Sequence, residues 1–268
     1  MPSSSESVYM TVLQGAALFV AAILGSTLNA VAGGGSFITF PTLVFAGVPA
    51  VRANATSTVA LWPGGLASVG AYRDTFTTER RDLITLGLTS AVGGVVGAIL
   101  LLHTSSPTFL KLVPFLLLGA TLLFAFGGRL TANWLKASEP TAKRNQRSML
   151  AVVALQFVIA VYGGFFGGGI GILMLATLSF MGMTNIHAMN GLKALLATCI
   201  NGVAVVTFVV ASAVDWPAAI IMIVGGIVGG YGAAAAARRV DQAVVRRIVI
   251  VVGLGMAIYF FTTQYLTA

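Results

Sequence analysis

Long apolar segments follow one another along most of this 268-residue chain, and they constrain its fold more than any other feature. A helix needs about 20 apolar residues to cross a hydrocarbon core of about 30 Å. The composition agrees, because 57% of the residues are hydrophobic and only 8% are charged, whereas a soluble domain carries roughly 25% charged residues. We therefore expect an all-α, polytopic transmembrane helical bundle in a lipid bilayer, and we exclude soluble enzymes and nucleic-acid-binding proteins.

Ten apolar segments are expected, five on each side of a polar linker. The second and the seventh hold only 12 to 14 residues, which reach about 20 Å as a helix, so we predict broken or re-entrant short helices there. No Lys or Arg precedes the first segment, so we expect it to stay in the protein rather than to be a cleaved signal peptide. The segments are Val8–Ala32, Phe37–Val48, Ala53–Tyr72, Leu83–Leu102, Leu110–Phe126, Met149–Phe166, Ile170–Met183, Ala188–Val214, Trp216–Ala237 and Ile248–Leu266.

Two glycine motifs recur in the same order in both halves of the chain. The triplet Gly33–Gly35, which precedes the first short segment, recurs as Gly167–Gly169. The motif Val92–Gly97 returns as Val224–Gly229. The recurrence predicts an internal duplication, with an N-terminal transmembrane repeat (1–128), a basic cytoplasmic linker (129–147) and a C-terminal transmembrane repeat (148–268).

The positive charges indicate how the two repeats are oriented. Cytoplasmic loops of membrane proteins are enriched in Lys and Arg, and here the basic loops occupy non-equivalent places in the two halves. Equivalent loops are therefore expected to face opposite sides, which predicts two inverted-topology repeats with both termini outside the cell. The alternative is that these arginines only solvate the loop ends. They are Arg73, Arg80 and Arg81 before the fourth segment, and Arg238, Arg239, Arg246 and Arg247 before the tenth.

Each glycine triplet follows a long segment and precedes a short one. Glycine permits a helix to break, and the free N–H groups at the start of a half-helix bind anions. Inverted repeats would bring the two breaks together near the middle of the membrane. The alternative is that the glycines only permit close helix packing.

Polar side chains gather where each short segment leads into the next long one. Lys193 is the only basic residue placed deep within an apolar segment, and a cation inside the membrane indicates function. The alternative for Arg52 and Lys193 is that their side chains extend to the membrane interface. The alternative for His187 is a structural, hydrogen-bonded role. The predicted substrate-binding set is Gly33, Gly34, Gly35, Ser36, Arg52, Asn54, Thr56, Ser57, Gly167, Gly168, Gly169, His187, Asn190 and Lys193, with Asn29, Gln156 and Asn201 as weaker candidates.

Acidic residues are absent from the middle of every apolar segment. All seven lie in a tail, a loop or a segment end, whereas cation pumps commonly use buried carboxylates, so an anionic solute is favoured. The sequence contains no catalytic, metal-binding or nucleotide-binding motif, and its single cysteine is Cys199. We expect no catalytic residue, metal ion or cofactor, although a membrane-embedded enzyme is kept as a weaker alternative.

Two stretches carry a family resemblance: GGGSFITFPTLVFAGVPAVRANATS in the first half and GGGIGILMLATLSFMGMTNIHAMNGLKAL in the second. With the basic linker, they resemble the TauE/SafE family of sulfite and organosulfonate permeases, also called the 4-toluene sulfonate uptake family. The first half meets the family pattern at Pro41, Ala53, Thr56 and Ser57, whereas the second has Leu175 in place of the proline. The resemblance covers essentially the whole chain and implies a carrier of small sulfur oxyanions in a bacterial inner membrane.

The sequence therefore predicts a secondary transporter, an exporter of small organosulfur anions such as sulfoacetate or sulfite, that works by alternating access. The alternatives are a permease for another small anion, an amino acid or a metal. A homodimer and coupling to protons or sodium are left open, as is the identity of the anion.

Overall fold

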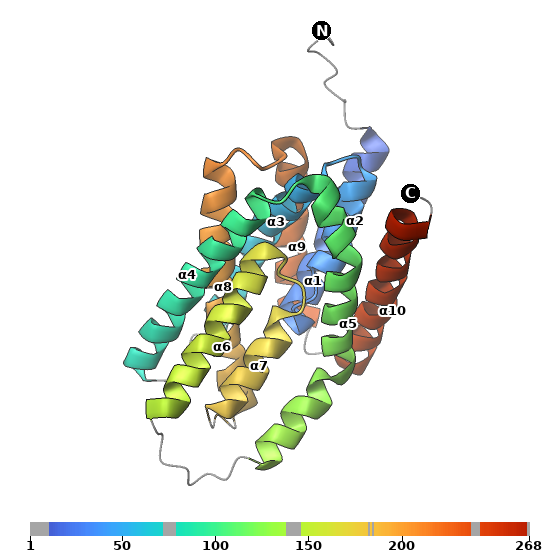
Figure 1. Cartoon of the computed structure of the whole chain (residues 1–268). Helices are drawn as coiled ribbons and strands as arrows, with labels where there is room; N and C mark the ends of the chain where they lie inside the picture. The colour runs from blue at the N-terminus through green and yellow to red at the C-terminus, as the bar shows by residue number, and fades with distance from the viewer. Residues whose placement is uncertain are drawn as a thin grey trace.

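The computed structural model describes residues 11–71, 79–137, 146–181, 183, 185–236 and 242–266. Regular structure in these residues is entirely helical, which confirms the all-α prediction there (Figure 1). A short π-helix, Thr262–Leu266, continues the last α-helix. The ten α-helices are α1 (Val12–Ala32), α2 (Ser36–Phe45), α3 (Ala50–Ala71), α4 (Arg80–Leu102), α5 (Ser106–Ala137), α6 (Gln146–Phe165), α7 (Ile170–Phe180), α8 (Ile186–Val210), α9 (Trp216–Ala236) and α10 (Gln242–Phe261).

Each predicted segment overlaps one of these helices, but α5 and α6 extend into the expected linker. Helix α5 runs to Ala137 and α6 begins at Gln146. Of the expected linker 129–147, only residues 138–145 are not part of these two helices, and they lie outside the described residues. Residues 129–137 contain no proline and several good helix formers. The polar residues therefore predicted where α5 and α6 are connected, but they did not predict where α5 ends.

The helices differ in their capacity to cross a membrane. Among the described residues, α1, α4, α5, α8 and α10 with its π-helical extension hold apolar stretches long enough to do so. The apolar stretches of α6 and α9 are shorter. Helices α2 and α7 have 10 and 11 residues, and lengths of about 15 and 17 Å are too short to span the hydrocarbon core.

Large apolar side chains cover the outside of the bundle. Leu88 on α4 is 63% exposed, Phe115 on α5 is 54% exposed and Val251 on α10 is 70% exposed. A soluble protein of this size rarely leaves such residues in contiguous patches, so these surfaces fit contact with lipid. The chain is a multi-pass membrane protein.

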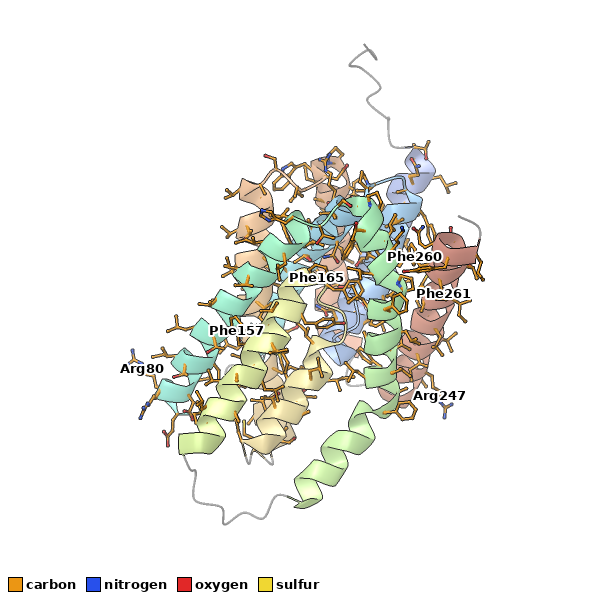
Figure 2. All side chains as sticks on the ribbon, viewed as in Figure 1. Arg80, Phe157, Phe165, Arg247, Phe260 and Phe261 are labelled. Atoms are coloured by element: carbon orange, nitrogen blue, oxygen red, sulfur yellow. The ribbon has the colours of Figure 1, made fainter. Side chains whose placement is uncertain are left out.

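The two ends of the bundle differ in which helix ends and which basic residues lie there. The start of α1 and the end of α10 lie at one end, whereas the end of α5 and the start of α6 lie at the other (Figure 1). Arg80 and Arg247 both lie at the second end (Figure 2). Helices α5 and α10 pack together and run in opposite directions (Figure 1).

The contacts between helices form matching pairs. Helices α1 to α5 of the first half correspond in order to α6 to α10 of the second half. Under this correspondence the contact α1–α9 is matched by α6–α4, α3–α9 by α8–α4, and α2–α3 by α7–α8, and all six contacts occur. The second glycine motif lies in two of the matching contacts. Gly97 on α4 approaches the carbonyl of Val161 on α6, and Gly229 on α9 approaches that of Ile23 on α1, so closely that a methyl group would overlap either oxygen.

Aromatic packing holds the short helix α2 in the interior. Phe37 and Phe40 are at most 1% exposed. The ring of Phe37 meets Phe124 of α5 edge to face, and that of Phe40 packs in the same way against Phe109 of α5 and Phe166, which follows α6. A helix of ten residues is marginal on its own, so this packing fixes where α2 begins and thereby positions one wall of the site.

Candidate functional site

A glycine in the left-handed conformation breaks the chain after both α1 and α6. Gly33 caps the end of α1 with φ of 80°, and Gly167, two residues beyond the end of α6, has φ of 81°. Residues with a Cβ rarely adopt this conformation. The first glycine of each triplet is therefore the one that ends the preceding helix.

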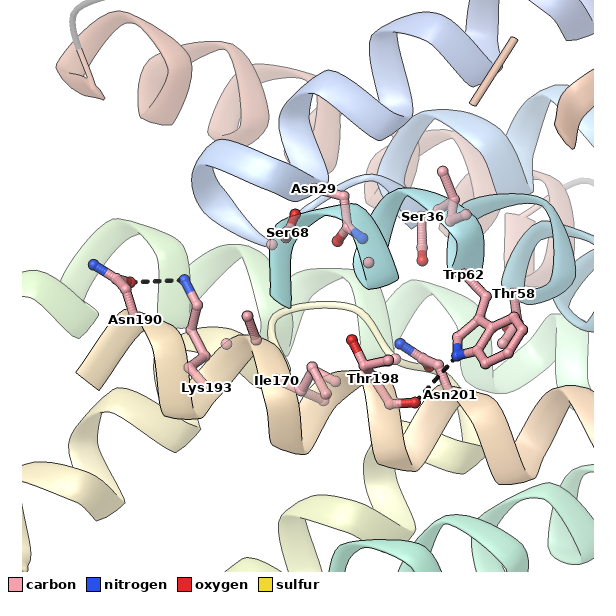
Figure 3. Close-up of a pocket in the computed structure, with 17 residues that line it drawn as sticks. Asn29, Ser36, Thr58, Trp62, Ser68, Ile170, Asn190, Lys193, Thr198 and Asn201 are labelled. Atoms are coloured by element: carbon pink, nitrogen blue, oxygen red, sulfur yellow. Dashed lines mark hydrogen bonds between the residues drawn. The ribbon is translucent and has the colours of Figure 1, made fainter. Parts of the chain in front are cut away.

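The two breaks lie next to each other and border one cavity of about 80 Å³. A methyl group placed on Gly33 would lie 3.8 Å from Cα of Gly171, in the first turn of α7. The wall is built from both halves of the chain (Figure 3). It consists of Asn29, Gly33, Ser36, Thr58, Leu61, Trp62, Gly65, Ser68, Gly167, Ile170, Gly171, Asn190, Lys193, Ala194, Ala197, Thr198 and Asn201.

Lys193 is the one side chain with a formal charge among these residues. Its Nζ donates a hydrogen bond of 3.0 Å to Oδ1 of Asn190, one turn earlier on α8. Its aliphatic stem runs beside Gly171, where an added methyl group would lie 3.3 Å from Cδ of Lys193. The missing side chain at Gly171 thus leaves room for the lysine at the break.

Four neutral polar side chains of the wall have no hydrogen-bond partner among the described residues: Asn29, Ser36, Thr198 and Asn201. Hydroxyl groups away from the cavity, such as those of Thr121 on α5 and Thr207 on α8, donate instead to backbone carbonyls four residues earlier. Polar groups inside a membrane protein that lack a partner are costly. Their gathering at one cavity therefore indicates a place for water or a polar solute.

Trp62 joins the two halves at this cavity, because its indole N–H donates to the backbone carbonyl of Thr198 at 3.2 Å. Sequence reasoning missed both residues and ranked Asn29 and Asn201 low. A helical signal existed, since Asn190, Lys193, Ala197 and Asn201 recur at spacings of three or four and share one face of α8.

Arg52 and Thr56 do not line the cavity. Nη2 of Arg52 donates to the carbonyl of Val214 at 3.1 Å, and the hydroxyl of Thr56 accepts from the N–H of Asp215 at 2.9 Å. Asp215 in turn caps α9 by accepting from the N–H of Ala218. These two predicted residues tie α3 to the connection between α8 and α9.

Ser57 and Asn54 are buried but also lie outside the wall. The hydroxyl of Ser57 bonds to that of Thr39 on α2 at 2.6 Å. Nδ2 of Asn54 donates to the carbonyl of Phe165 at the end of α6, while its Oδ1 has no partner. The backbone of His187 belongs to α8, but its side chain lies outside the described residues.

The other glycines of the triplets pack closely against neighbouring residues. A methyl group on Gly34 would lie 3.3 Å from the side chains of Phe124 and Val249, and one on Gly169 would lie 3.2 Å from Cβ of Ala120. Gly35 approaches the carbonyl of Gly25, and Gly168 lies against the ring of Phe166. Close packing, the alternative interpretation of the triplets, describes Gly34, Gly35 and Gly168, whereas Gly169 also has a left-handed backbone, with φ of 79°, at the start of α7.

The electrostatics of the cavity favour an anion. Lys193 supplies a positive charge, and no acidic residue is part of the wall. Helices α2 and α7 begin at Ser36 and Ile170, beside the cavity, and the first N–H groups of a helix lack partners within it and carry partial positive charge. No group of three or more metal-ligating side chains was found among the described residues.

Comparisons with known proteins agree with a role in transport. The sequence model of the family described as sulfite exporter TauE/SafE matches residues 18–260. A probable membrane transporter protein of Haemophilus influenzae is 26% identical over 242 residues, which cover 90% of this chain and 92% of the relative. The probable membrane transporter proteins ORF9 of Sinorhizobium (26% identical over 249 residues, 90% of each chain) and YfcA of Escherichia coli K12 (24% over 242 residues, 90% of this chain and 87% of the relative) are also similar.

No solved structure matches the chain. The family match covers most of the sequence, and its members are membrane transporters rather than enzymes. This chain belongs to the sulfite exporter TauE/SafE family of membrane transporters.

Proposed function

We propose that this protein is a secondary transporter that exports small organosulfur anions, such as sulfoacetate or sulfite, across the bacterial inner membrane. The observation that carries the proposal is the cavity between the two helix breaks, whose one formal charge is that of Lys193. The family description as sulfite exporters supports a sulfur oxyanion as the solute. Sulfonates stay ionised at physiological pH and therefore suit a site that is positive and free of carboxylates.

The proposal includes two inverted-topology repeats, residues 1–128 and 148–268, joined by the linker 129–147. Three observations support it: the matching helix contacts, the opposite directions of α5 and α10, and the equivalent packing of Gly97 and Gly229. Transporters built in this way bind their solute near the middle of the membrane, between the repeats and at interrupted helices.

The position of the cavity supports alternating access. Its wall combines α1, the start of α2 and α3 from the first repeat with the break before α7, the start of α7 and α8 from the second. Movement of one repeat against the other would expose the bound anion to either side in turn. Lys193, Asn190 and the helix starts offset the charge of the anion, while Ser36 and the neighbouring polar side chains orient it.

The basic residues support an orientation in the membrane. Arg80 and Arg81 begin α4, and Arg247 lies in the second turn of α10, at the end of the bundle where α5 ends. The enrichment of basic residues on the cytoplasmic side assigns that end to the cytoplasm. Both termini then lie outside. A membrane potential that is negative inside favours the export of an anion by about 2.3 kcal/mol per charge per 100 mV.

The test is flux of radiolabelled sulfoacetate and of sulfite through the purified protein in proteoliposomes, with protein-free liposomes as the control. We expect saturable flux that unlabelled sulfur oxyanions inhibit. Competition by other small anions, amino acids and metal salts tests the alternative solutes, and imposed proton or sodium gradients test coupling. Correctly folded protein that moves neither anion would refute the proposal.

A further inference from the structure

The polar groups of the cavity lie in two places that differ in chemistry. At one end Lys193 and Asn190 are joined by their hydrogen bond, and away from them lie the neutral groups of Asn29, Ser36, Thr198 and Asn201 (Figure 3). The side chains of Asn29 and Ser36 point from their wall toward those of Thr198 and Asn201 (Figure 3). These four residues are named here the neutral cluster.

The neutral cluster has donors and acceptors that the protein does not use. No hydrogen bond joins its side chains to other described residues. By contrast, Thr207, on α8 with Thr198 and Asn201, and Thr58, on α3, each donate their hydroxyl group to a carbonyl of their own helix. A bare anion held at Lys193 would leave these groups to water alone. A solute with a second polar end would use them.

The spacing along α8 gives the approximate scale of such a solute. Lys193 and Asn201 are eight residues apart, which is about 12 Å of helix rise, and Thr198 lies between them. Hydrogen bonds of about 3 Å at each end leave about 6 Å for the solute, the length of a two- or three-carbon chain with a polar group at each end. Leu61, Trp62 and Ala197 line the cavity and offer apolar contact for the carbons.

We propose that the cavity recognises both ends of a short bifunctional organic anion, with the anionic group at Lys193 and a second hydrogen-bonding group, such as a hydroxyl or a carboxyl, at the neutral cluster. This inference rests on the proposed function and narrows its substrate class, because a bare oxyanion fills only the charged end. Discrimination then comes from polar groups that stay unpaired when the second end is missing. Such sites reject an analogue that lacks the matching group far more strongly than apolar pockets do.

Two sulfonates that differ in one hydroxyl group provide the test. The exchange of radiolabelled sulfoacetate in proteoliposomes is inhibited with 2-hydroxyethanesulfonate or with ethanesulfonate, and the two inhibition constants are compared. We expect the hydroxylated compound to bind about tenfold more tightly, as one net hydrogen bond of about 1.4 kcal/mol corresponds to a factor of ten.

Variants on α8 separate recognition from folding. Thr198→Val combined with Asn201→Leu removes the polar groups, and we expect the ratio of the two inhibition constants to fall to about one while ethanesulfonate still inhibits. Thr207→Val removes a hydroxyl of the same helix that is bonded to the carbonyl of Val203, and it should keep the wild-type ratio.

The outcomes decide between the two proposals. Exchange with equal inhibition by both sulfonates in the wild type, or a ratio unchanged in the double variant, overturns the bifunctional recognition and leaves the transport function standing. A folded wild-type protein with no exchange of any sulfonate overturns both.

Discussion

Replacing Lys193 with methionine removes the charge from the cavity while it keeps an unbranched side chain of similar length. The aliphatic stem beside Gly171 is thereby preserved, and a cavity of alanine size is not created. Lys193→Met therefore tests the charge itself. Its matched control is Lys111→Met, because Lys111 is exposed on α5 and lies outside the cavity.

The expected loss follows from the position of the charge. Two unit charges about 4 Å apart interact by about 4 kcal/mol at an effective dielectric constant of about 20. As each 1.4 kcal/mol is a factor of ten in affinity, removal of the charge should weaken anion binding by about a thousandfold. The thermal stability of the variant should not fall, because a charge inside the membrane is itself costly.

The assay is inhibition of sulfoacetate exchange in proteoliposomes, read together with the melting temperature of the detergent-solubilised protein. Lys193→Met should lose exchange at concentrations that saturate the wild type, whereas Lys111→Met should keep it. The reasoning fails if Lys193→Met retains an affinity within tenfold of the wild type. It fails equally if Lys111→Met shows the same loss.

Three further predictions address packing, a loop contact and topology. Gly97→Ala should destabilise the protein by about 1–3 kcal/mol through overpacking, seen as a lower melting temperature, while Gly87→Ala, where an added methyl group meets nothing within 4 Å, should not; equal melting temperatures would contradict the α4–α6 contact. Arg52→Gln should lower the melting temperature slightly and leave sulfoacetate affinity unchanged, since the guanidinium donates to a loop carbonyl and Arg52 does not line the cavity. A large loss of affinity would instead indicate that Arg52 contributes to anion binding. In a cysteine-free background, Ser105→Cys should react with an impermeant maleimide added to whole cells, whereas Glu79→Cys should react only after the cells are opened; the reverse pattern would invert the proposed orientation.

The positions of the helices could be predicted because the membrane imposes a simple rule. Backbone N–H and C=O groups have no water to bond inside the hydrocarbon core, so apolar segments form helices. The starts and ends depend on local chemistry instead. Thr11 illustrates this at the start of α1, where its hydroxyl and the side chain of Gln14 form a capping box, and α5 illustrates the opposite case, since it runs on into the polar linker to Ala137.

The candidate site was only partly predictable, and α3 shows why. Arg52 and Thr56 are one turn apart and face the connection after α8, whereas Thr58, Leu61, Trp62 and Gly65 follow the spacing of another face and line the cavity. All of these residues lie in one short stretch of sequence. Polarity alone could not tell which face would meet the cavity, because that depends on how α3 packs against α8 and α9.

The amino-acid sequence by itself determined that this protein is a bundle of membrane helices, that two of them are short, that glycine triplets precede both, and that its deep basic residue is Lys193. These properties follow from hydropathy and from the backbone freedom of single residues, which act locally. Only the tertiary structure decided that Gly33 and Gly167 border one cavity, that Lys193 shares it with Asn29, Ser36, Thr198 and Asn201, and that Arg52 does not. Side chains from distant segments converge through the rotation and packing of whole helices, which no local pattern encodes.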